Sequence, residues 1–356
     1  MEPIELEDLP EEALLLIDST PITDDFDKVW ERMLPPDAYQ FPDDAPGERP
    51  AGGWTRTFPH PLGVRGAKPQ ADFYGRWQRS PYSDEYLEKM ASAMIERMQL
   101  GRGAGTDFLA VSFSALDLVG HAYGPRSHEV QDVLFRLDAT IGRLLKTLDE
   151  RVGRSNYVLG LSADHGVADI PEQTTDAGRL LAAAVNTALQ KILASAVGPG
   201  PHGVLVNYTD IYLAPAVAKR LRDDPQARNA VLTGLQGLTG IARAMFGDEL
   251  TTADARASSD PVRRAAALSY HPGRSGDIIV VPRERWLFSD AATTHGSLYE
   301  YDQRVPVILF GAGVKSGSYS ETASPADIAP SLAAAVKVPM KDTDGRVLRE
   351  ALTNRP

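Results

Sequence analysis

The candidate reactive groups of this sequence are two pairs that each combine a carboxylate with a histidine. Asp117 and His121 stand four residues apart in SFSALDLVGH, residues 112–121. One turn of helix, or a tight loop, would point both side chains at one place. Asp164 and His165 are adjacent in LSADHG, residues 161–166, where Gly166 permits a sharp turn. Carboxylates and imidazoles are suitable zinc ligands, so both pairs are candidate metal sites.

Each pair also has a plainer interpretation. Asp117 and His121 could be a salt-linked surface pair, and Asp164 could cap a turn beside an incidental histidine. Two such pairs after two successive predicted strands favour the ligand interpretation. His295, in TTHGS (293–297), is a third candidate. A lone histidine in a polar loop is ordinary, and this one matters because the two pairs need a further ligand.

The elements that must position these residues alternate between strand and helix. FLAVSF (108–113) and YVLGLS (157–162) are predicted buried strands. Ser83 is predicted to cap a helix before the first, and Ser127 a long helix between them. Further helices are predicted at 178–196, at 224–238 and from Ser324, and strands at 204–213, 277–281 and 305–310. The alternation predicts an α/β fold with a mostly parallel sheet, helices on both faces and ligands beyond the strand ends.

The composition argues against several classes of protein and of metal site. The 356 residues carry a net charge of -11, which argues against nucleic-acid binding through phosphate neutralisation. There are no cysteines, so any metal must be held by histidines and carboxylates. The apolar runs are too short for a membrane span. Residues 1–8 are acidic and do not form a secretion signal.

Several motifs together resemble one family. SFSALDLVGHAYGPRSHEV, LSADHGVA and TTHGSLYEYDQRVPVILFGAGV are similar to the alkaline phosphatase superfamily. The resemblance covers roughly residues 75–350 and is strongest to the nucleotide pyrophosphatase/phosphodiesterase-like branch, which includes bacterial alkaline phosphatases with a threonine nucleophile. It implies an alkaline phosphatase-like fold and a zinc-dependent hydrolase of small phosphate esters with two Zn²⁺. It also implies that Asp117, His121 and His295 bind one zinc, and that Asp164 and His165 bind the other.

The chain departs from the family pattern near its start. The family's nucleophile and a further zinc-binding aspartate lie upstream of every motif matched here, so no catalytic nucleophile is assigned. Residues 1–80 are predicted to be a partial insert and irregular segment, and residues 81–356 the C-terminal part of the catalytic domain. The sheet would then lack its first strands, and these residues alone would be impaired. Export to the periplasm or cell exterior is suggested by the resemblance only.

Alternatives stay open at this point. Ala13–Asp18 could be the first strand with its metal aspartate, and Thr55 or Thr57 the nucleophile. A sulfatase, a phosphoglycerate mutase-like enzyme, or a non-catalytic metal-binding remnant would share the scaffold. Of the other candidates, Tyr301 and Asp302 are predicted to support the His295 loop. The remaining predictions are a solvated His128, structural roles for His60, His202 and His271, and core positions for Met90, Met94 and Met98.

Overall fold

The structure is a computed structural model that describes residues 10–50, 52–64 and 66–353. The acidic residues 1–8 lie outside the described part. The chain forms two compact units, residues 1–166 with 304–356, and residues 167–303. The predicted division into a partial insert (residues 1–80) and the C-terminal part of the catalytic domain (residues 81–356) is a different division and stays a prediction.

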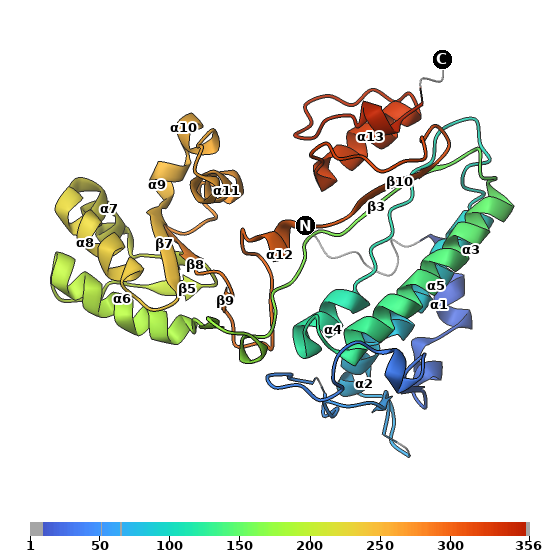
Figure 1. The fold of residues 1–356 in the computed structure, drawn as a ribbon, viewed down its shortest axis with the longest axis horizontal. Helices are drawn as coiled ribbons and strands as arrows, with labels where there is room; N and C mark the ends of the chain where they lie inside the picture. Colours follow the sequence, from blue (N-terminus) through green and yellow to red (C-terminus); the bar gives the residue numbers. More distant parts are fainter. Residues whose placement is uncertain (1–9, 51, 65, 354–356) are drawn as a thin grey trace. The chain divides into compact units, whose positions relative to one another are not determined.

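The first unit contains helices, short 3-10 turns and four strands (Figure 1). Its elements are α1 (Glu11–Ser19), η2 (Ile22–Asp25), β1 (Val29–Trp30), η3 (Pro36–Ala38), β2 (His60–Pro61), α2 (Ala71–Gln78), α3 (Pro81–Arg97), α4 (Ala115–Tyr123), α5 (His128–Arg151), β3 (Val158–Ser162), β10 (Val307–Gly311), η5 (Pro325–Asp327), α13 (Ile328–Ala335) and η6 (Arg349–Ala351).

Two helical segments of this unit begin at residues whose side chains cap them. Ser127 accepts a hydrogen bond from the Val130 N–H and starts α5, as predicted. Ser324 forms a capping box with Asp327 at the turn that leads into α13, which confirms the predicted last helix. The predicted N-cap at Ser83 is wrong, because the helix begins about one turn earlier. The N-cap of α3 is Ser80, because Pro81 occupies the first helical position and presets its backbone angle.

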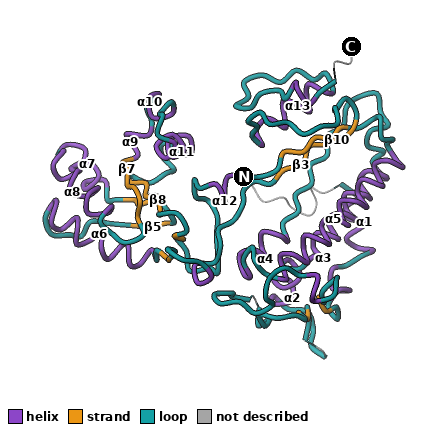
Figure 2. The backbone as a smooth tube through the Cα atoms, viewed as in Figure 1, coloured by secondary structure: helices purple, strands orange, loops and turns teal. Residues whose placement is uncertain are grey.

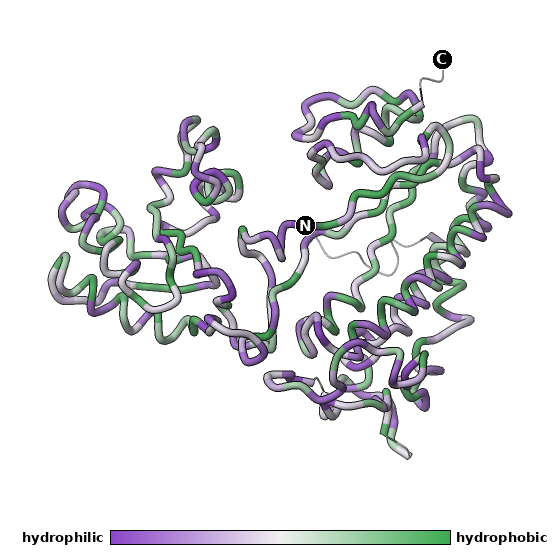
Figure 3. Tube along the Cα trace, in the orientation of Figure 1, coloured by the Kyte–Doolittle hydropathy of each residue, from purple (hydrophilic) through white to green (hydrophobic). Residues whose placement is uncertain are grey.

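The two-stranded sheet of the first unit joins β3 to β10. The strands are antiparallel, from Val307 opposite Ser162 to Gly311 opposite Val158. Helix α13 packs on β3 at Gly160, where a Cβ atom would lie 2.4 Å from Cγ2 of Ile328. Glycine is therefore required at this position for the helix to approach the strand. Both strands, β3 and β10, consist largely of hydrophobic residues (Figure 3).

The predicted buried strand at Phe108–Phe113 is not formed. The segment is irregular (Figure 2), and Phe108 is 84% exposed. A strand needs a neighbour for its backbone groups, and no described strand pairs with this segment. Val111 and Phe113 still pack against Ala91 and Leu144, so one side of the segment lies on α3 and α5.

The predicted irregular segment near the start of the chain folds around one buried carboxylate, Asp132 of α5. Asp132 is fully buried. Its oxygens accept hydrogen bonds from Trp30 Nε1 at 2.6 Å, the Met33 N–H at 2.6 Å, the Tyr39 hydroxyl at 2.5 Å and Arg136 Nε at 2.7 Å. Four donors from the long loop and the helix itself thus share one acceptor group, which fixes the loop on α5.

One alternative and two sequence predictions for this unit are wrong. Ala13–Asp18 belongs to helix α1 and not to a first strand, which removes Asp18 as its metal ligand. His128 is buried and not solvated, because its ring lies against Tyr39 and bonds the Phe41 carbonyl. Met98 is 45% exposed, since it follows the last turn of α3.

A second buried pair joins His60 to Glu129. Nε2 of His60 lies 2.8 Å from Oε1 of Glu129, and both side chains are fully buried, which confirms a structural role for His60. Burial raises the pKa of Glu129 to about 9 and lowers the pKa of His60 to about 4. The folded pair therefore holds one proton between these pH values, whichever of the two residues carries it.

This pair predicts a loss of stability at alkaline pH. An unfolded histidine–glutamate pair releases its last proton near pH 6.5. Above that pH the folded state binds more protons than the unfolded state, so stability falls as pH rises, by at most about 1.4 kcal/mol per unit. Urea midpoints between pH 7.5 and 8.5 should show this slope, and Glu129→Gln should remove most of it. Glu150→Gln, exposed on the same helix, should keep it; an unchanged slope in Glu129→Gln would contradict the assignment.

The second unit contains a four-stranded sheet and a separate two-stranded ladder. Helices cover both faces of the larger sheet (Figure 1). The elements of this unit are η4 (Pro171–Gln173), β4 (Gly178–Arg179), α6 (Ala182–Val197), β5 (Leu205–Asn207), β6 (Asp210–Tyr212), α7 (Pro215–Asp223), α8 (Pro225–Gln236), β7 (Ile241–Phe246), α9 (Gly247–Leu250), α10 (Ala253–Arg256), α11 (Pro261–Ser269), β8 (Ile278–Pro282), β9 (Trp286–Leu287) and α12 (Glu300–Gln303).

The period-two pattern of β7 and β8 explains why both faces of this sheet are covered. Ala244, Phe246 and Val280 face the core formed with α6, α7 and α8. Met245 and Val281 face the smaller core formed with α9, α10 and α11. Alternate residues point to opposite faces of a strand, so each face is apolar.

The α/β class predicted from the sequence is confirmed, with a difference in strand direction. The larger sheet has the order β5-β6-β8-β7 and its ladders are antiparallel. Among the described strands, β4 and β9 form the one parallel ladder. The predicted single strand at 204–213 is a hairpin, because Tyr208 takes a left-handed backbone angle of φ 53° at the turn. In the described part of the chain, no helix combines the length and apolarity needed to cross a membrane.

Candidate functional site

Helix α4 carries Asp117 and His121 on its outward face. Ala115, Val119, Ala122 and Tyr123 are buried, so the opposite side of the helix is fixed against the unit. Nε2 of His121 lies 3.5 Å from Oδ1 of Asp117, and the two side chains are 31% and 40% exposed. The helical spacing predicted from the sequence therefore brings this carboxylate and this imidazole together, with both still accessible to an ion.

A buried aspartate that the sequence reasoning missed positions the start of α4. Oδ1 of Asp84 accepts hydrogen bonds from the N–H groups of Ser114 at 3.1 Å and Ala115 at 3.2 Å. Burial raises the pKa of Asp84, and the two backbone donors oppose that rise. Asp84 lies in the first turn of α3, where an acidic residue is common, so its sequence context gives no sign that it caps a different helix.

The second pair follows β3 directly. Asp164 and His165 come two and three residues after the strand ends at Ser162. Nδ1 of His165 donates a hydrogen bond to the Gly166 carbonyl oxygen, at 2.8 Å. This hydrogen bond selects the tautomer whose Nε2 carries the lone pair that a metal ion needs. The Asp164 side chain is 87% exposed, and its Oδ2 lies 3.4 Å from His165 Nε2.

The two pairs do not form one cluster. Within the described part of the first unit, neither Asp164 nor His165 joins Asp117 and His121 in a group of ligand atoms lying within 4.8 Å of one another. One ion could not be bound by all four residues with this spacing. Asp164 and His165 therefore stay a candidate ion position separate from Asp117 and His121.

His295 belongs to the second unit, in a loop held at several points. Oγ1 of the buried Thr293 donates to the Ala168 carbonyl at 2.6 Å, and the Ala168 N–H donates to the Thr294 carbonyl at 3.3 Å. The Tyr208 hydroxyl donates to the His295 carbonyl. Gly296 has φ 96°, a backbone angle that favours glycine, so the chain can reverse directly after His295.

Asp302 supports the same loop, as predicted. It is buried, and its Oδ2 accepts the Ser297 N–H at 2.7 Å. Tyr301 also bonds to this loop, because its hydroxyl forms a side-chain hydrogen bond with Ser297. The same hydroxyl accepts the Arg285 N–H at 3.2 Å. Burial raises the pKa of both Tyr208 and Tyr301, which keeps these hydroxyls protonated and able to act as donors.

The support from Asp302 can be tested by replacement. If His295 holds zinc as predicted, Asp302→Ala should weaken zinc binding about tenfold, because residues that orient a metal ligand contribute at this level. Asp302→Asn should restore most of the affinity, since its side-chain oxygen can still accept the Ser297 N–H. Asp290→Ala, in an exposed part of the preceding loop, is the matched control. Zinc titration by calorimetry measures all three; equal affinities for Asp302→Ala and Asp290→Ala would contradict the supporting role.

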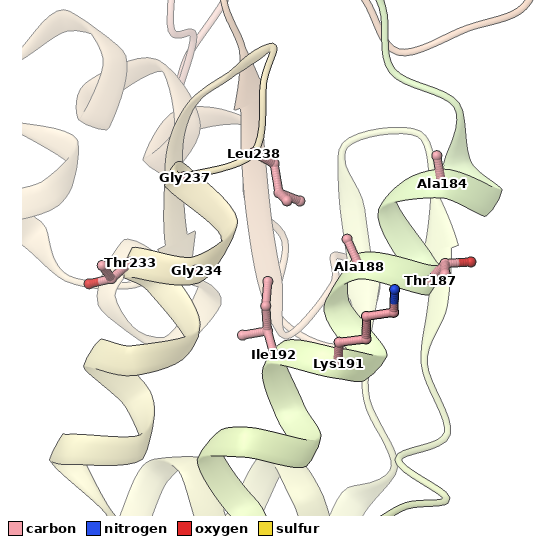
Figure 4. Close-up of a pocket in the computed structure, with 9 residues that line it drawn as sticks. All are labelled: Ala184, Thr187, Ala188, Lys191, Ile192, Thr233, Gly234, Gly237 and Leu238. Atoms are coloured by element: carbon pink, nitrogen blue, oxygen red, sulfur yellow. The ribbon is translucent and has the colours of Figure 1, made fainter.

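A hollow in the second unit is lined by other residues. A groove of about 660 Å³ runs between α6 and α8 and is lined by small and apolar side chains (Figure 4). Lys191 is its one charged lining residue, and none of the five predicted ligands lines it. Its chemistry does not suit a metal or an acid–base reaction.

The alternative nucleophiles do not stand at a catalytic position. The Thr55 hydroxyl donates to the Thr57 carbonyl at 2.7 Å. Residues 52–59 form turns and bends, so neither threonine stands at a helix N-terminus. Together with the helical Ala13–Asp18, this removes the observations on which that alternative depended.

Relatives of the chain can now be compared with this arrangement. The alkaline phosphatase PhoV of Synechococcus elongatus is 28% identical over 92% of this chain and 60% of its own length. The alkaline phosphatase PhoK of a Sphingomonas species is 31% identical over 85% of this chain and 57% of its own length. The chain thus spans about 60% of the length of these relatives.

A solved structure and a protein family are also similar to this chain. The crystal structure of wild-type alkaline phosphatase PafA superposes with a TM-score of 0.85 and 25% identity, covering 98% of this chain and 67% of that one. The type I phosphodiesterase / nucleotide pyrophosphatase family matches residues 35–304. This match includes Asp117, His121, Asp164, His165 and His295, and it covers most of the chain. The chain belongs to the type I phosphodiesterase / nucleotide pyrophosphatase family.

Proposed function

We propose that this protein hydrolyses phosphate esters with two bound zinc ions. Asp117, His121 and His295 would hold one ion, and Asp164 and His165 would contribute to the other. The observation that carries the proposal is the accessible Asp117–His121 pair, 3.5 Å apart on the outward face of α4 in a member of this family. Relatives named as alkaline phosphatases support the same class of reaction.

The donor set suits zinc. The proposed ligands are imidazole nitrogens and carboxylate oxygens, and the chain has no cysteine. Three protein ligands leave a fourth position open for water or substrate, which is how catalytic zinc is held. When bound, such an ion polarises a phosphoryl oxygen and lowers the pKa of a bound hydroxyl or water.

The chain's own residues would orient and stabilise this site. Asp84 fixes the start of α4, so the Asp117 and His121 side chains keep their spacing. The Gly166 carbonyl fixes the His165 tautomer. Thr293, Tyr208 and Asp302 hold the loop that presents His295. A site positioned by rigid neighbours needs little reorganisation when substrate binds.

The nucleophile is not assigned to any described residue, and we propose that turnover by these 356 residues alone is slow. A covalent nucleophile divides the hydrolysis into two easier steps, so its absence would lower the rate strongly. Water would then be the attacking group at the site formed by Asp117, His121 and His295. The activity expected of this chain is therefore weak but dependent on zinc.

Hydrolysis of nitrophenyl esters tests the proposal. Nitrophenyl phosphate and bis-nitrophenyl phosphate should both be assayed with the apo-protein and after addition of two equivalents of zinc. We expect slow nitrophenol release that requires zinc and is reversed by a chelator. The ratio of the two rates reports monoester or diester preference. A zinc-loaded rate no higher than that of the Asp117→Ala variant would contradict the proposed activity.

A further inference from the structure

Three buried side chains of the first unit carry polar atoms that the described residues leave without a hydrogen bond. Glu48 is 7% exposed, and His60 and Glu129 are fully buried. The atoms without a partner among the described residues are both carboxylate oxygens of Glu48, Oε2 of Glu129 and Nδ1 of His60. Buried polar atoms of this kind are rare, because they lose their hydration without compensation. A partner from outside the chain would therefore stabilise them.

These side chains lie close together beside the first turn of α5. Nε2 of His60 lies 2.8 Å from Oε1 of Glu129, and the His60 ring packs on the Tyr123 ring with centroids 5.4 Å apart. Burial raises the pKa of both Glu129 and Tyr123, and the nearby charge of Glu48 raises both further. The Glu48 carboxylate therefore lies within electrostatic reach of Glu129 and Tyr123, and the three residues with unpartnered atoms form one site.

The site has more carboxylates than cations to pair with them. The charge of Asp43 acts on both Glu48 and Glu129. The nearest guanidinium groups are engaged elsewhere, because Arg32 pairs with Asp43 and Arg56 pairs with a neighbouring aspartate at 2.9 Å. Burial raises the pKa of Glu48 to about 7, and the charge of Arg56 offsets only part of that rise. The missing partner is therefore a cation.

We propose that Glu48 and Glu129 bind a calcium ion that joins the loop carrying Glu48 to α5. Calcium prefers carboxylate oxygens and accepts backbone carbonyls and water in a flexible geometry, whereas magnesium requires a near-ideal octahedron. In the described part of the chain, no third histidine or carboxylate joins these two within 4.8 Å. The other ligands would therefore be backbone carbonyls and water. The Glu48 side chain can turn toward the ion without breaking a hydrogen bond.

Thermal unfolding and terbium emission test this site in the full 356-residue chain at pH 8, where Glu48 is mostly ionised. Saturating Ca²⁺ should raise the Tm by at least about 2 °C, because an ion that binds the folded state stabilises it. Tb³⁺, which occupies calcium sites, should emit when tryptophan is excited, and Ca²⁺ should displace it. Trp30 and Trp54 are the expected donors, since their ring centroids lie 5.4 and 4.9 Å from that of His60. No zinc or substrate is present, so the result does not depend on whether the protein is a hydrolase.

Three variants locate the bound ion. Glu48→Gln should abolish the rise in Tm and weaken Tb³⁺ binding at least about tenfold, because a charged ligand is lost. Without Ca²⁺ its Tm should equal or exceed that of the unaltered chain, because a neutral amide costs less to bury than an unpaired charge. Glu31→Gln, exposed in the same loop, and Asp117→Ala, at the proposed zinc site, should respond to Ca²⁺ like the unaltered chain. The proposal is overturned if Ca²⁺ and Tb³⁺ have no effect, if their effect survives Glu48→Gln, or if Asp117→Ala removes it.

Discussion

Replacing Asp117 with alanine is expected to lower zinc affinity roughly 100-fold or more and to abolish zinc-dependent ester hydrolysis. The carboxylate is one of three ligands proposed for one ion, and loss of a direct ligand should exceed the 10- to 100-fold effects of residues that only orient ligands. The side chain is 40% exposed and lies on the outward face of α4, so the fold should tolerate its removal. Calorimetric zinc titration and the nitrophenyl assay measure the two effects.

A matched replacement elsewhere controls for general damage. Asp72 also lies in the first turn of a helix, α2, and is exposed. Asp72→Ala should leave both the zinc affinity and the hydrolysis rate unchanged. If Asp117→Ala and Asp72→Ala behaved alike, Asp117 would be an ordinary surface carboxylate paired with His121.

Replacing Asp132 with alanine is expected to destabilise the first unit by about 3 to 5 kcal/mol, the range for breaking a buried charged interaction by removing one partner. Four donors would lose their acceptor at once, among them Trp30 Nε1 and the Tyr39 hydroxyl. Urea unfolding followed by tryptophan fluorescence reports mainly this unit, because three of the four tryptophans, Trp30, Trp54 and Trp77, belong to it and Trp286 lies in the second unit.

The control for this prediction lies on the same helix. Asp138 of α5 is exposed, and Asp138→Ala should change the unfolding free energy by no more than about 0.5 kcal/mol. Comparable losses for the two variants would show that the position of the helix, and not the buried hydrogen-bond network, limits the stability of the unit.

Local signals in the sequence predicted much of this architecture. Ser127 and the Ser324-Pro325-Ala326-Asp327 motif mark real helix starts, because capping depends on residues within one turn. The spacing of Asp117 and His121 predicted their proximity, because a helix places residues four apart on one face. The adjacent Asp164 and His165 were correctly predicted to follow a strand.

Non-local features could not be predicted in this way. Phe108–Phe113 has a strand's composition, but strand formation requires a partner that no local pattern reveals. Asp84 caps a helix 30 residues away, and Asp132 binds Trp30 from 102 residues away. His128 is buried by a loop that carries Phe41 and Tyr39, so the polar sequence around it gave no sign of its burial.

Anomalous diffraction at the zinc absorption edge, from crystals grown with zinc, would show whether Asp117, His121 and His295 hold one zinc ion. We expect a strong peak about 2.0–2.2 Å from a carboxylate oxygen of Asp117 and an imidazole nitrogen of both His121 and His295, with a second peak at Asp164 and His165. Zinc-loaded crystals with no peak at Asp117 and His121, or with His295 outside the coordination sphere, would contradict it.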